Sequence, residues 1–299
     1  MAVDGITRAD AEALFDEALA GELINALPKR SAALSNLTVV PMGTSVARIP
    51  VLSALPTAAF LNASQAVKPQ SEVAWASKMI TAEEIAVIIP IDENVIADAS
   101  IDVVGRTIDL IVQEFGRVLD AAVFFGTGAP TTFPVGGLFG AATTVTGTGN
   151  IADDMNSLFA SVESVGNDVT DVFASRGLRS VLRGQKDGNG APIYVPTEGN
   201  PNIGSIYGVP AAYPLGWDKT KADAIAVDDS CAIIGLRSDV KTKILDQASL
   251  TGFGNLAERD SIAIRAVMRV GFTLANPASL ENPTGALPIA ALKPVVVTP

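Results

Sequence analysis

The clearest pattern in the chain is the helical spacing of polar residues between Ile101 and Phe125. Steps of three and four place these residues on one stripe of a helix. The stripe consists of Asp102, Arg106, Asp109, Gln113, Arg117 and Asp120. The opposing apolar face consists of Val104, Ile108, Ile111, Phe115, Val118, Leu119 and Ala122. With Ser100 as N-cap and Gly126 as C-cap, we expect a long helix whose polar stripe faces solvent or a neighbouring subunit and whose apolar face rests on a sheet.

A second helical pattern covers Thr7 to Leu27 and ends at Pro28. Its apolar face consists of Ala11, Leu14, Phe15, Ala18, Leu19, Leu23 and Ile24. Its other face is acidic and consists of Asp10, Glu12, Asp16, Glu17 and Glu22. Two interpretations remain open, a solvated surface helix and an arm that docks on another subunit.

Between Ser31 and Ile91 the pattern changes to the alternation of β-strands. The predicted strands are Leu37–Met42, Ser45–Leu52, Val73–Ile80 and Glu84–Ile91. The segment from Pro56 to Pro69 has no helical signal, so we predict a long two-stranded hairpin with a loose tip. An isolated hairpin has too little core to be stable, and a neighbouring subunit is the obvious support.

The C-terminal half predicts a compact mixed domain followed by one long strand. The Gly-, Pro- and Thr-rich stretch from Thr127 to Asn150 marks a loop-rich boundary. The elements predicted after it are helices at Ile151–Val165 and Arg176–Leu182 and strands at Val172–Ala174, Val209–Pro214, Ala224–Val227 and Ala232–Leu236. Ser261–Leu274 alternates throughout, and we expect it to pair with Ile85–Ile91 beneath the long helix. The tail from Pro277 is predicted to be extended.

Composition favours burial between subunits or in one large core. Hydrophobic residues make up 48% of the 299 residues, and the mean hydropathy is +0.35. No apolar run reaches the roughly eighteen residues that a membrane span needs, and the N-terminus lacks a signal-peptide pattern. The single cysteine, Cys231, excludes an intrachain disulfide, and we expect an ordinary buried thiol.

Charge and motifs argue against nucleic-acid recognition and catalysis. The net charge of −11 argues against a phosphate-binding surface. The absence of histidine removes the commonest general base and metal ligand. No dinucleotide fingerprint or nucleophile elbow is present. Asp187-Gly188-Asn189-Gly190 lacks the spaced ligands of a calcium loop. We therefore expect no cofactor, no metal and no enzymatic activity.

The order of these parts resembles the HK97-fold major capsid proteins of tailed bacteriophages, over nearly the whole chain. The similar stretches are ARIPVL (47–52), AEEIAVIIPIDENVIADASIDV (82–103), LDAAVFFGTG (119–128), LRGQKDGNGAPIYVP (182–196), IYGVPAAYP (206–214) and ERDSIAIRAVMRVGFTLANPASL (258–280). The resemblance implies an α+β, HK97-like capsid fold. Its segments would be an N-arm (1–43), an extended E-loop hairpin (44–80), the P-domain strand and spine helix (81–126), an A-domain (127–255), the P-domain return strand (256–280) and a C-terminal tail (281–299).

The resemblance implies a structural major capsid protein. Such a protein would self-assemble as pentamers and hexamers into an icosahedral shell that encloses phage dsDNA without sequence-specific binding. It would be assembled in the host bacterial cytoplasm and located in the virion capsid, without a membrane. Because the chain begins almost directly with the arm, the resemblance implies a separate scaffolding protein or none. Portal and decoration proteins are further possible partners.

The resemblance also suggests residues for contacts between subunits. Trp75 is either an anchor on a neighbouring subunit or part of its own core, and Arg48, Lys68 and Glu72 are ion-pair candidates. Some family members form Lys–Asn cross-links assisted by a Glu. The matching residue types here are Lys68, Lys78, Asn255 and Glu258. Their spacing is not distinctive, so we expect ordinary surface residues.

Two alternatives remain beside the phage capsid. An encapsulin-like compartment shell keeps the fold and encloses cargo enzymes, and the sequence does not separate it from a capsid. A soluble enzyme would need a carboxylate- or tyrosine-based site between Thr127 and Gly254, and no constellation of residues there supports one.

Overall fold

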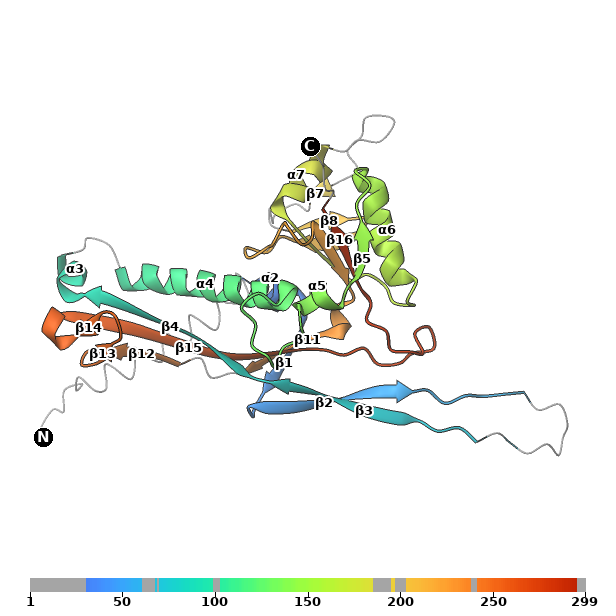
Figure 1. Cartoon of the computed structure of the whole chain (residues 1–299), viewed down its shortest axis with the longest axis horizontal. Helices are drawn as coiled ribbons and strands as arrows, with labels where there is room; N and C mark the ends of the chain where they lie inside the picture. The colour runs from blue at the N-terminus through green and yellow to red at the C-terminus, as the bar shows by residue number, and fades with distance from the viewer. Residues whose placement is uncertain are drawn as a thin grey trace, which may run out of the picture.

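The long helix α4 (Val103–Phe125) lies along the five-stranded one of two main sheets in the computed structural model of the protein (Figure 1). The structure describes residues 31–60, 68, 70–98, 103–184, 195–196, 203–237 and 241–294. Gly126 ends α4 with a φ of 62°, and its N–H donates to the Ala122 carbonyl at 2.9 Å. Gly126 is therefore the C-cap that the sequence predicts.

The remaining elements follow in chain order. The other helices are α2 (Ala32–Asn36), α3 (Glu93–Asp98), α5 (Gly137–Ala141), α6 (Ile151–Glu163), α7 (Arg176–Gly184) and the 3₁₀ turns η1 (Asp229–Cys231) and η2 (Ala257–Arg259). The strands are β1 (Thr38–Met42), β2 (Val46–Ala54), β3 (Ala74–Thr81), β4 (Glu83–Asp92), β5 (Thr143–Thr146), β6 (Asp171–Ala174), β7 (Val195–Pro196), β8 (Ile203–Ile206), β9 (Val209–Ala212), β10 (Ala224–Val227), β11 (Ala232–Arg237), β12 (Lys241–Leu245), β13 (Ser249–Leu250), β14 (Gly254–Asn255), β15 (Ser261–Leu274) and β16 (Ile289–Lys293).

The first sheet has the order β1-β11-β15-β12, and β4 also pairs with β15. β4 and β15 are antiparallel over ten residue pairs, from Glu83 opposite Val270 to Asp92 opposite Ser261. One face of these strands shares a buried cluster with the apolar face of α4. The members of this cluster from α4 and β15 include Ile108, Ile111, Phe115, Leu119, Ile264, Ala266, Met268 and Val270. The predicted pairing beneath the helix is confirmed.

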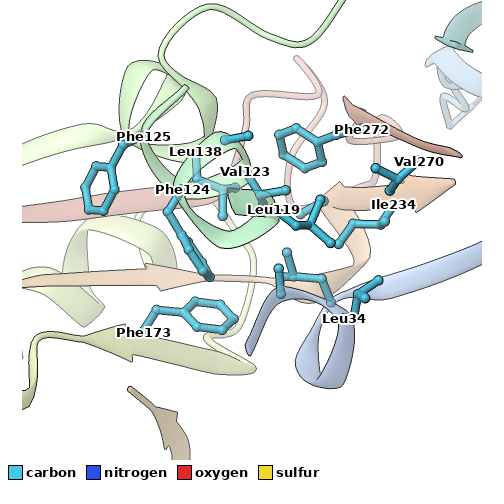
Figure 2. Close-up of a cluster of buried hydrophobic side chains, with 14 of the residues drawn as sticks. Leu34, Leu119, Val123, Phe124, Phe125, Leu138, Phe173, Ile234, Val270 and Phe272 are labelled. Carbon is cyan, nitrogen blue, oxygen red and sulfur yellow. The ribbon is translucent and has the colours of Figure 1, made fainter. Parts of the chain in front are cut away.

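The second sheet has seven strands in the order β5-β16-β10-β6-β9-β8-β7, and α6 packs against it. The buried residues of α6 include Met155, Leu158, Phe159 and Val162, as its sequence pattern predicts. Aromatic residues at the end of α4 connect the two sheets (Figure 2). The rings of Phe124 and Phe173 lie 4.6 Å apart, and the ring of Phe124 lies 5.6 Å from that of Trp217. The two sheets therefore share one hydrophobic core.

The hairpin of β2 and β3 extends away from this body (Figure 1). Its antiparallel register, from Val46 opposite Thr81 to Ala54 opposite Ala74, confirms the predicted hairpin. Its base packs where Gly235 and Gly271 face each other in the first sheet. A Cβ on Gly235 would collide with the sulfur of Met42, and one on Gly271 would lie 2.6 Å from the Thr81 carbonyl oxygen. Glycine is required there because the hairpin base approaches so closely.

Sheet membership differs from the segment boundaries that the sequence suggests. β11 and β12, inside the expected A-domain segment 127–255, belong to the first sheet, as does β1 from the expected N-arm. β16, from the expected tail, lies in the second sheet between β5 and β10. Alternation identifies a strand but does not identify its partner, so the pattern alone did not assign these strands to sheets.

Several short elements were not predicted, and some predictions remain without a test. α5 and β5 lie in the stretch that we interpreted as loop, and α2 and α3 are single-turn helices too short for periodicity to reveal. The helix predicted for Thr7–Leu27 lies outside the described residues, as do Ile101 and Asp102 at the expected start of the long helix. Most of the predicted hairpin tip lies outside them as well.

Candidate assembly surfaces

The outer face of the hairpin carries large apolar side chains that are exposed in the single chain. Trp75 is 68% exposed and Met79 59% exposed, and both point to the same side of β3 because they are four residues apart. The other side of the hairpin carries Val51 and Ile80, which are buried against the body. Trp75 therefore does not fill the core of its own subunit.

The charged hairpin candidates are exposed and separate from one another. Arg48 lies opposite Met79 in the hairpin register, and Lys68 and Glu72 lie in extended chain near the tip. None of these three residues forms an ion pair with another described residue. Within one subunit they form no network, and their role in contacts stays a prediction.

The candidate cross-linking residues lie in two separate regions. Asn255 and Glu258 are in β14 and η2, at the end of the first sheet that is far from the hairpin, and the two lysines belong to the hairpin (Figure 1). The side-chain amide of Asn255 donates to a carboxylate oxygen of Glu258 at 3.4 Å, at the end where β14 and η2 meet. Lys78 is exposed on β3, and Lys68 is exposed closer to the hairpin tip. One subunit therefore brings Asn255 and Glu258 together and keeps both lysines away from them.

A pocket of about 470 Å³ opens near this Asn–Glu pair. Its lining residues are Pro90, Asp92, Phe253, Arg259 and Ser261. The guanidinium of Arg259 lies 5.0 Å from the centre of the Phe253 ring, a favourable cation–π contact. Two of the lining residues, Asp92 and Ser261, face each other across β4 and β15.

Among the described residues of the predicted polar stripe, Asp120 alone is fully buried. Its carboxylate accepts hydrogen bonds from the Ser31 hydroxyl at 2.7 Å and from the N–H groups of Ala32 and Ala33 at 3.1 Å each. These bonds cap the N-terminus of α2, which covers the stripe at this point. The expected exposure of Asp120 was wrong because the helical pattern of α4 contains no information about a short helix packed on it.

Burial makes Asp120 a weaker acid than an ordinary aspartate. Removal from water raises its pKa to about 6, although the bonds from Ser31, Ala33 and Ala32 oppose this shift. No charged side chain in the described part of the chain contributes to the shift. Asp120 thus joins the first described residue of the arm segment, Ser31, to the spine helix through a carboxylate that accepts three hydrogen bonds and forms no ion pair with a described residue.

Two other titratable groups, Asp171 and Cys231, are also buried. Burial raises the pKa of Asp171 to about 6, and the charges of Asp229 and Asp228 add to this effect. Cys231 is buried, and burial raises the pKa of its thiol. Across the described ranges, no group of His, Cys, Asp or Glu side chains is arranged to hold a metal ion. No helix in these ranges is long and apolar enough to span a membrane.

Comparisons with known proteins agree with this architecture. The model of the phage capsid family matches residues 13–284. A solved chain from Microbacterium phage Oxtober96 is 37% identical with a TM-score of 0.77, and the alignment covers 97% of this chain and 99% of that chain. A chain from Mycobacterium phage Cain is 30% identical with a TM-score of 0.78, covering 98% of this chain and 100% of that chain. No curated protein sequence matches significantly.

A solved chain from Mycobacterium phage Adephagia is 29% identical with a TM-score of 0.79, covering 99% of this chain and all of that chain. The family match spans most of the sequence, and the structural matches include both sheets, the long helix and the hairpin. The same elements carry the resemblance seen in the sequence. The chain therefore belongs to the phage capsid family and is a structural major capsid protein with the HK97 fold.

Proposed function

We propose that copies of this subunit assemble as pentamers and hexamers into an icosahedral shell that encloses phage dsDNA. Equivalent contacts repeated around closed symmetry axes would hold the shell together. Many weak contacts on every side of a subunit give stability through multivalency. The net charge of −11 suits a wall that should not adhere to the packaged DNA. Assembly would take place in the host cytoplasm, with scaffolding, portal and decoration proteins as further candidate partners.

The exposed apolar face of the hairpin is the observation that carries this proposal. An aromatic ring of the size of Trp75 is costly to leave in water, and such side chains are enriched at the centres of protein interfaces. Its 68% exposure in the single chain is relieved if the hairpin lies across a neighbouring subunit. Arg48, Lys68 and Glu72 would then form ion pairs at the rim of this contact, where each contributes little by itself.

Negative-stain microscopy of the purified full chain, with Trp75→Ala as the variant, tests the proposal. We expect shells from the unchanged chain and fewer or less stable shells from Trp75→Ala. Val135→Ala is the matched control, because Val135 is also apolar and is 94% exposed, but in a loop outside the hairpin. Far-UV circular dichroism should show the same fold in all three proteins.

Removal of residues 62–70 at the hairpin tip extends this test. Assembly should fail while the subunit stays folded. A chain that stays monomeric at micromolar concentration, even with a scaffolding protein present, would contradict the shell function. A tip deletion that unfolds the subunit would contradict our assignment of the tip to the intersubunit contact.

The encapsulin-like and enzyme alternatives gain no support from the comparisons. Nucleic acid inside purified particles favours the capsid, whereas a co-purifying enzyme would favour the compartment shell. We expect no cross-link between subunits, so the candidate residues would be ordinary surface residues. These residues are Lys68, Lys78, Asn255 and Glu258. A single monomer band from mature particles on a denaturing gel is the expected result, and a ladder of heavier bands would contradict it.

A further inference from the structure

Three carboxylates meet where the chain crosses from the second sheet to the first. Asp171 begins β6, and Asp228 and Asp229 directly follow β10 at the start of η1, which leads into β11. Asp171 lies opposite Val227, the last residue of β10. The hydroxyl oxygen of Thr170 lies 3.2 Å from a carboxylate oxygen of Asp171 and 3.3 Å from one of Asp229. We call Asp171, Asp228 and Asp229 the carboxyl cluster.

Two members of the carboxyl cluster compete for one hydrogen-bond donor. The Thr170 hydroxyl has a single proton, and the Val227 carbonyl oxygen also lies 3.3 Å from it. In the described part of the chain, this hydroxyl is the only donor to the carboxylate of Asp171 or of Asp229. Asp171 is only 9% exposed, so a bond that Thr170 does not supply is not readily replaced by water. A proton bound to one of the two carboxyl groups would supply the missing donor.

The surroundings of the carboxyl cluster offer no cation to balance it. Residues 163–171, 224–231 and 275–288 contain no lysine, arginine or histidine. Outside the cluster, the titratable side chains in these ranges are Glu163, Asp168, Cys231 and Glu281. Among the neighbouring elements, β1 and β9 carry no charged residue, α6 carries Asp153 and Asp154 besides Glu163, and β11 carries Arg237 at its far end. Burial, together with the charges of Asp229 and Asp228, therefore raises the pKa of Asp171 to about 6, although the Thr170 hydrogen bond opposes this shift.

Hydrogen bonds connect the carboxyl cluster to the second crossing between the sheets, from β15 to β16. The side-chain amide of Asn167 donates to the Asp228 carboxylate at 2.9 Å, and its oxygen accepts from the amide of Asn282 in that crossing at 3.0 Å. The N–H of Ala275, where the second crossing begins, donates to the Cys231 carbonyl at 2.9 Å. The two crossings, residues 228–231 and 275–288, are thus bonded to each other beside the cluster. We call them together the joint.

We propose that the carboxyl cluster makes this joint acid-responsive, with a proton held by Asp171 or Asp229 keeping the two crossings closed. The closed joint buries Asp171, whereas opening exposes its carboxyl group to water. The closed state therefore binds the proton more tightly, and opening becomes rarer as the pH falls. This contribution is fully present below about pH 3.8 and is lost as the pH rises through about 6. The inference concerns the single subunit and does not depend on the proposed shell.

Hydrogen exchange of the full-length, unassembled subunit, measured by mass spectrometry between pH 5 and 7.5, tests the proposal. EDTA is present, so that no divalent cation takes the place of the proton. The reporter peptides contain Asp229, whose N–H donates to the Thr170 hydroxyl at 2.8 Å, and Ala275. After correction for the intrinsic exchange rate, their protection should rise about tenfold from pH 7 to pH 5, as linkage to one such group requires.

Four variants identify the group that responds. Asp171→Asn keeps the shape and cannot titrate, so its protection should not change with pH. Asp229→Asn removes a neighbouring charge and should move the midpoint of the profile to lower pH, whereas Thr170→Val removes the opposing hydrogen bond and should move it to higher pH. Asp168→Asn, at an exposed carboxylate in the same loop, is the matched control and should leave the profile unchanged.

The outcomes decide the proposal even if one variant folds poorly. Wild-type protection that is independent of pH, or a response retained in Asp171→Asn, would overturn it. If circular dichroism shows that Asp171→Asn is unfolded, the midpoints of the other variants decide. Opposite shifts for Asp229→Asn and Thr170→Val support the carboxyl cluster, and unchanged midpoints in both overturn it. Either result leaves the shell function standing, because the measurement uses unassembled subunits.

Discussion

Substitution of Asp120 should change both the stability of the subunit and its dependence on pH. The carboxylate is fully buried and faces no cation among the described groups, and its pKa is raised from 3.8 to about 6. A difference of this size corresponds to about 3 kcal/mol between the two protonation states. Because the folded state holds the proton more tightly than the unfolded state, protonation stabilises the fold. This contribution is fully present below about pH 3.8 and is lost as the pH rises through about 6.

Asp120→Asn removes the buried charge and keeps one oxygen, which can still accept hydrogen bonds from both the Ser31 hydroxyl and the Ala33 N–H. At pH 7.5 the loss of one hydrogen bond, about 1 kcal/mol, is offset by relief of the buried charge. We therefore expect the variant to be close to wild type or slightly more stable at pH 7.5. At pH 4.5 it should be less stable than wild type by about 1–3 kcal/mol, because the wild type then carries a neutral carboxyl.

Asp120→Ala provides the matched comparison. It removes the acceptor of all three donors and leaves the N–H groups of Ala32 and Ala33 without their partner. Each unsatisfied buried donor costs about 1–3 kcal/mol, so this variant should be less stable than Asp120→Asn at every pH. Its amide protons in α2 should also exchange faster with solvent, because the cap that holds this single turn is lost.

Urea unfolding of the unassembled subunit between pH 4.5 and 7.5 is the assay, followed by tryptophan fluorescence. Subtracting the Asp120→Asn curve from the wild-type curve isolates Asp120 from other carboxylates, including Asp171, whose pKa is also raised to about 6. Parallel stability curves for wild type and Asp120→Asn would refute the assignment of a raised pKa to Asp120. An Asp120→Ala variant as stable as Asp120→Asn would refute the role of its hydrogen bonds.

The remaining predictions concern the hairpin base and the single thiol. Gly235→Ala should destabilise the subunit by about 1–3 kcal/mol and speed proteolysis at the hairpin base, because its Cβ meets Met42 and Ile80. An alanine at Gly184, which has open space around its Cβ position, is the control, and equal effects at the two sites would contradict the close approach. Cys231 should react with a thiol reagent only after unfolding, because it is 0% exposed and burial raises its pKa. Rapid labelling of the folded subunit would show that the site opens.

The elements with many turns or many alternations were predictable from the sequence. α4, β15 and β4 repeat their pattern often enough to identify both the element and its buried face. The pairing of β4 with β15 followed from their lengths. The hairpin was predictable because its two alternating strands flank a stretch without helical signal.

The parts that could not be predicted depend on contacts between distant segments. α2 has only five residues and is fixed by Asp120, which is 89 residues from Ser31 in the sequence. The sheet that β16 joins depends on its pairing with β5 and β10, and its five residues give no indication of either partner. Among the candidate contact residues, the sequence identified Trp75 but left open which way it points. Local patterns report the periodicity of a segment and do not report what covers it.

Truncating a buried core residue should have a different consequence from truncating an exposed apolar residue of the hairpin. Phe124 and Leu119 lie in the core that both sheets share, so truncating either leaves a cavity and lowers subunit stability by about 3–5 kcal/mol. Trp75 and Met79 contact little of their own subunit, so truncating them removes almost nothing from the free energy of folding. If the hairpin is a contact between subunits, these two classes must diverge, with core variants losing fold and shell together and hairpin variants losing the shell alone. A hairpin variant that lowers the unfolding midpoint as much as Phe124→Ala would place the hairpin in the subunit core and remove the main support for the assembly proposal.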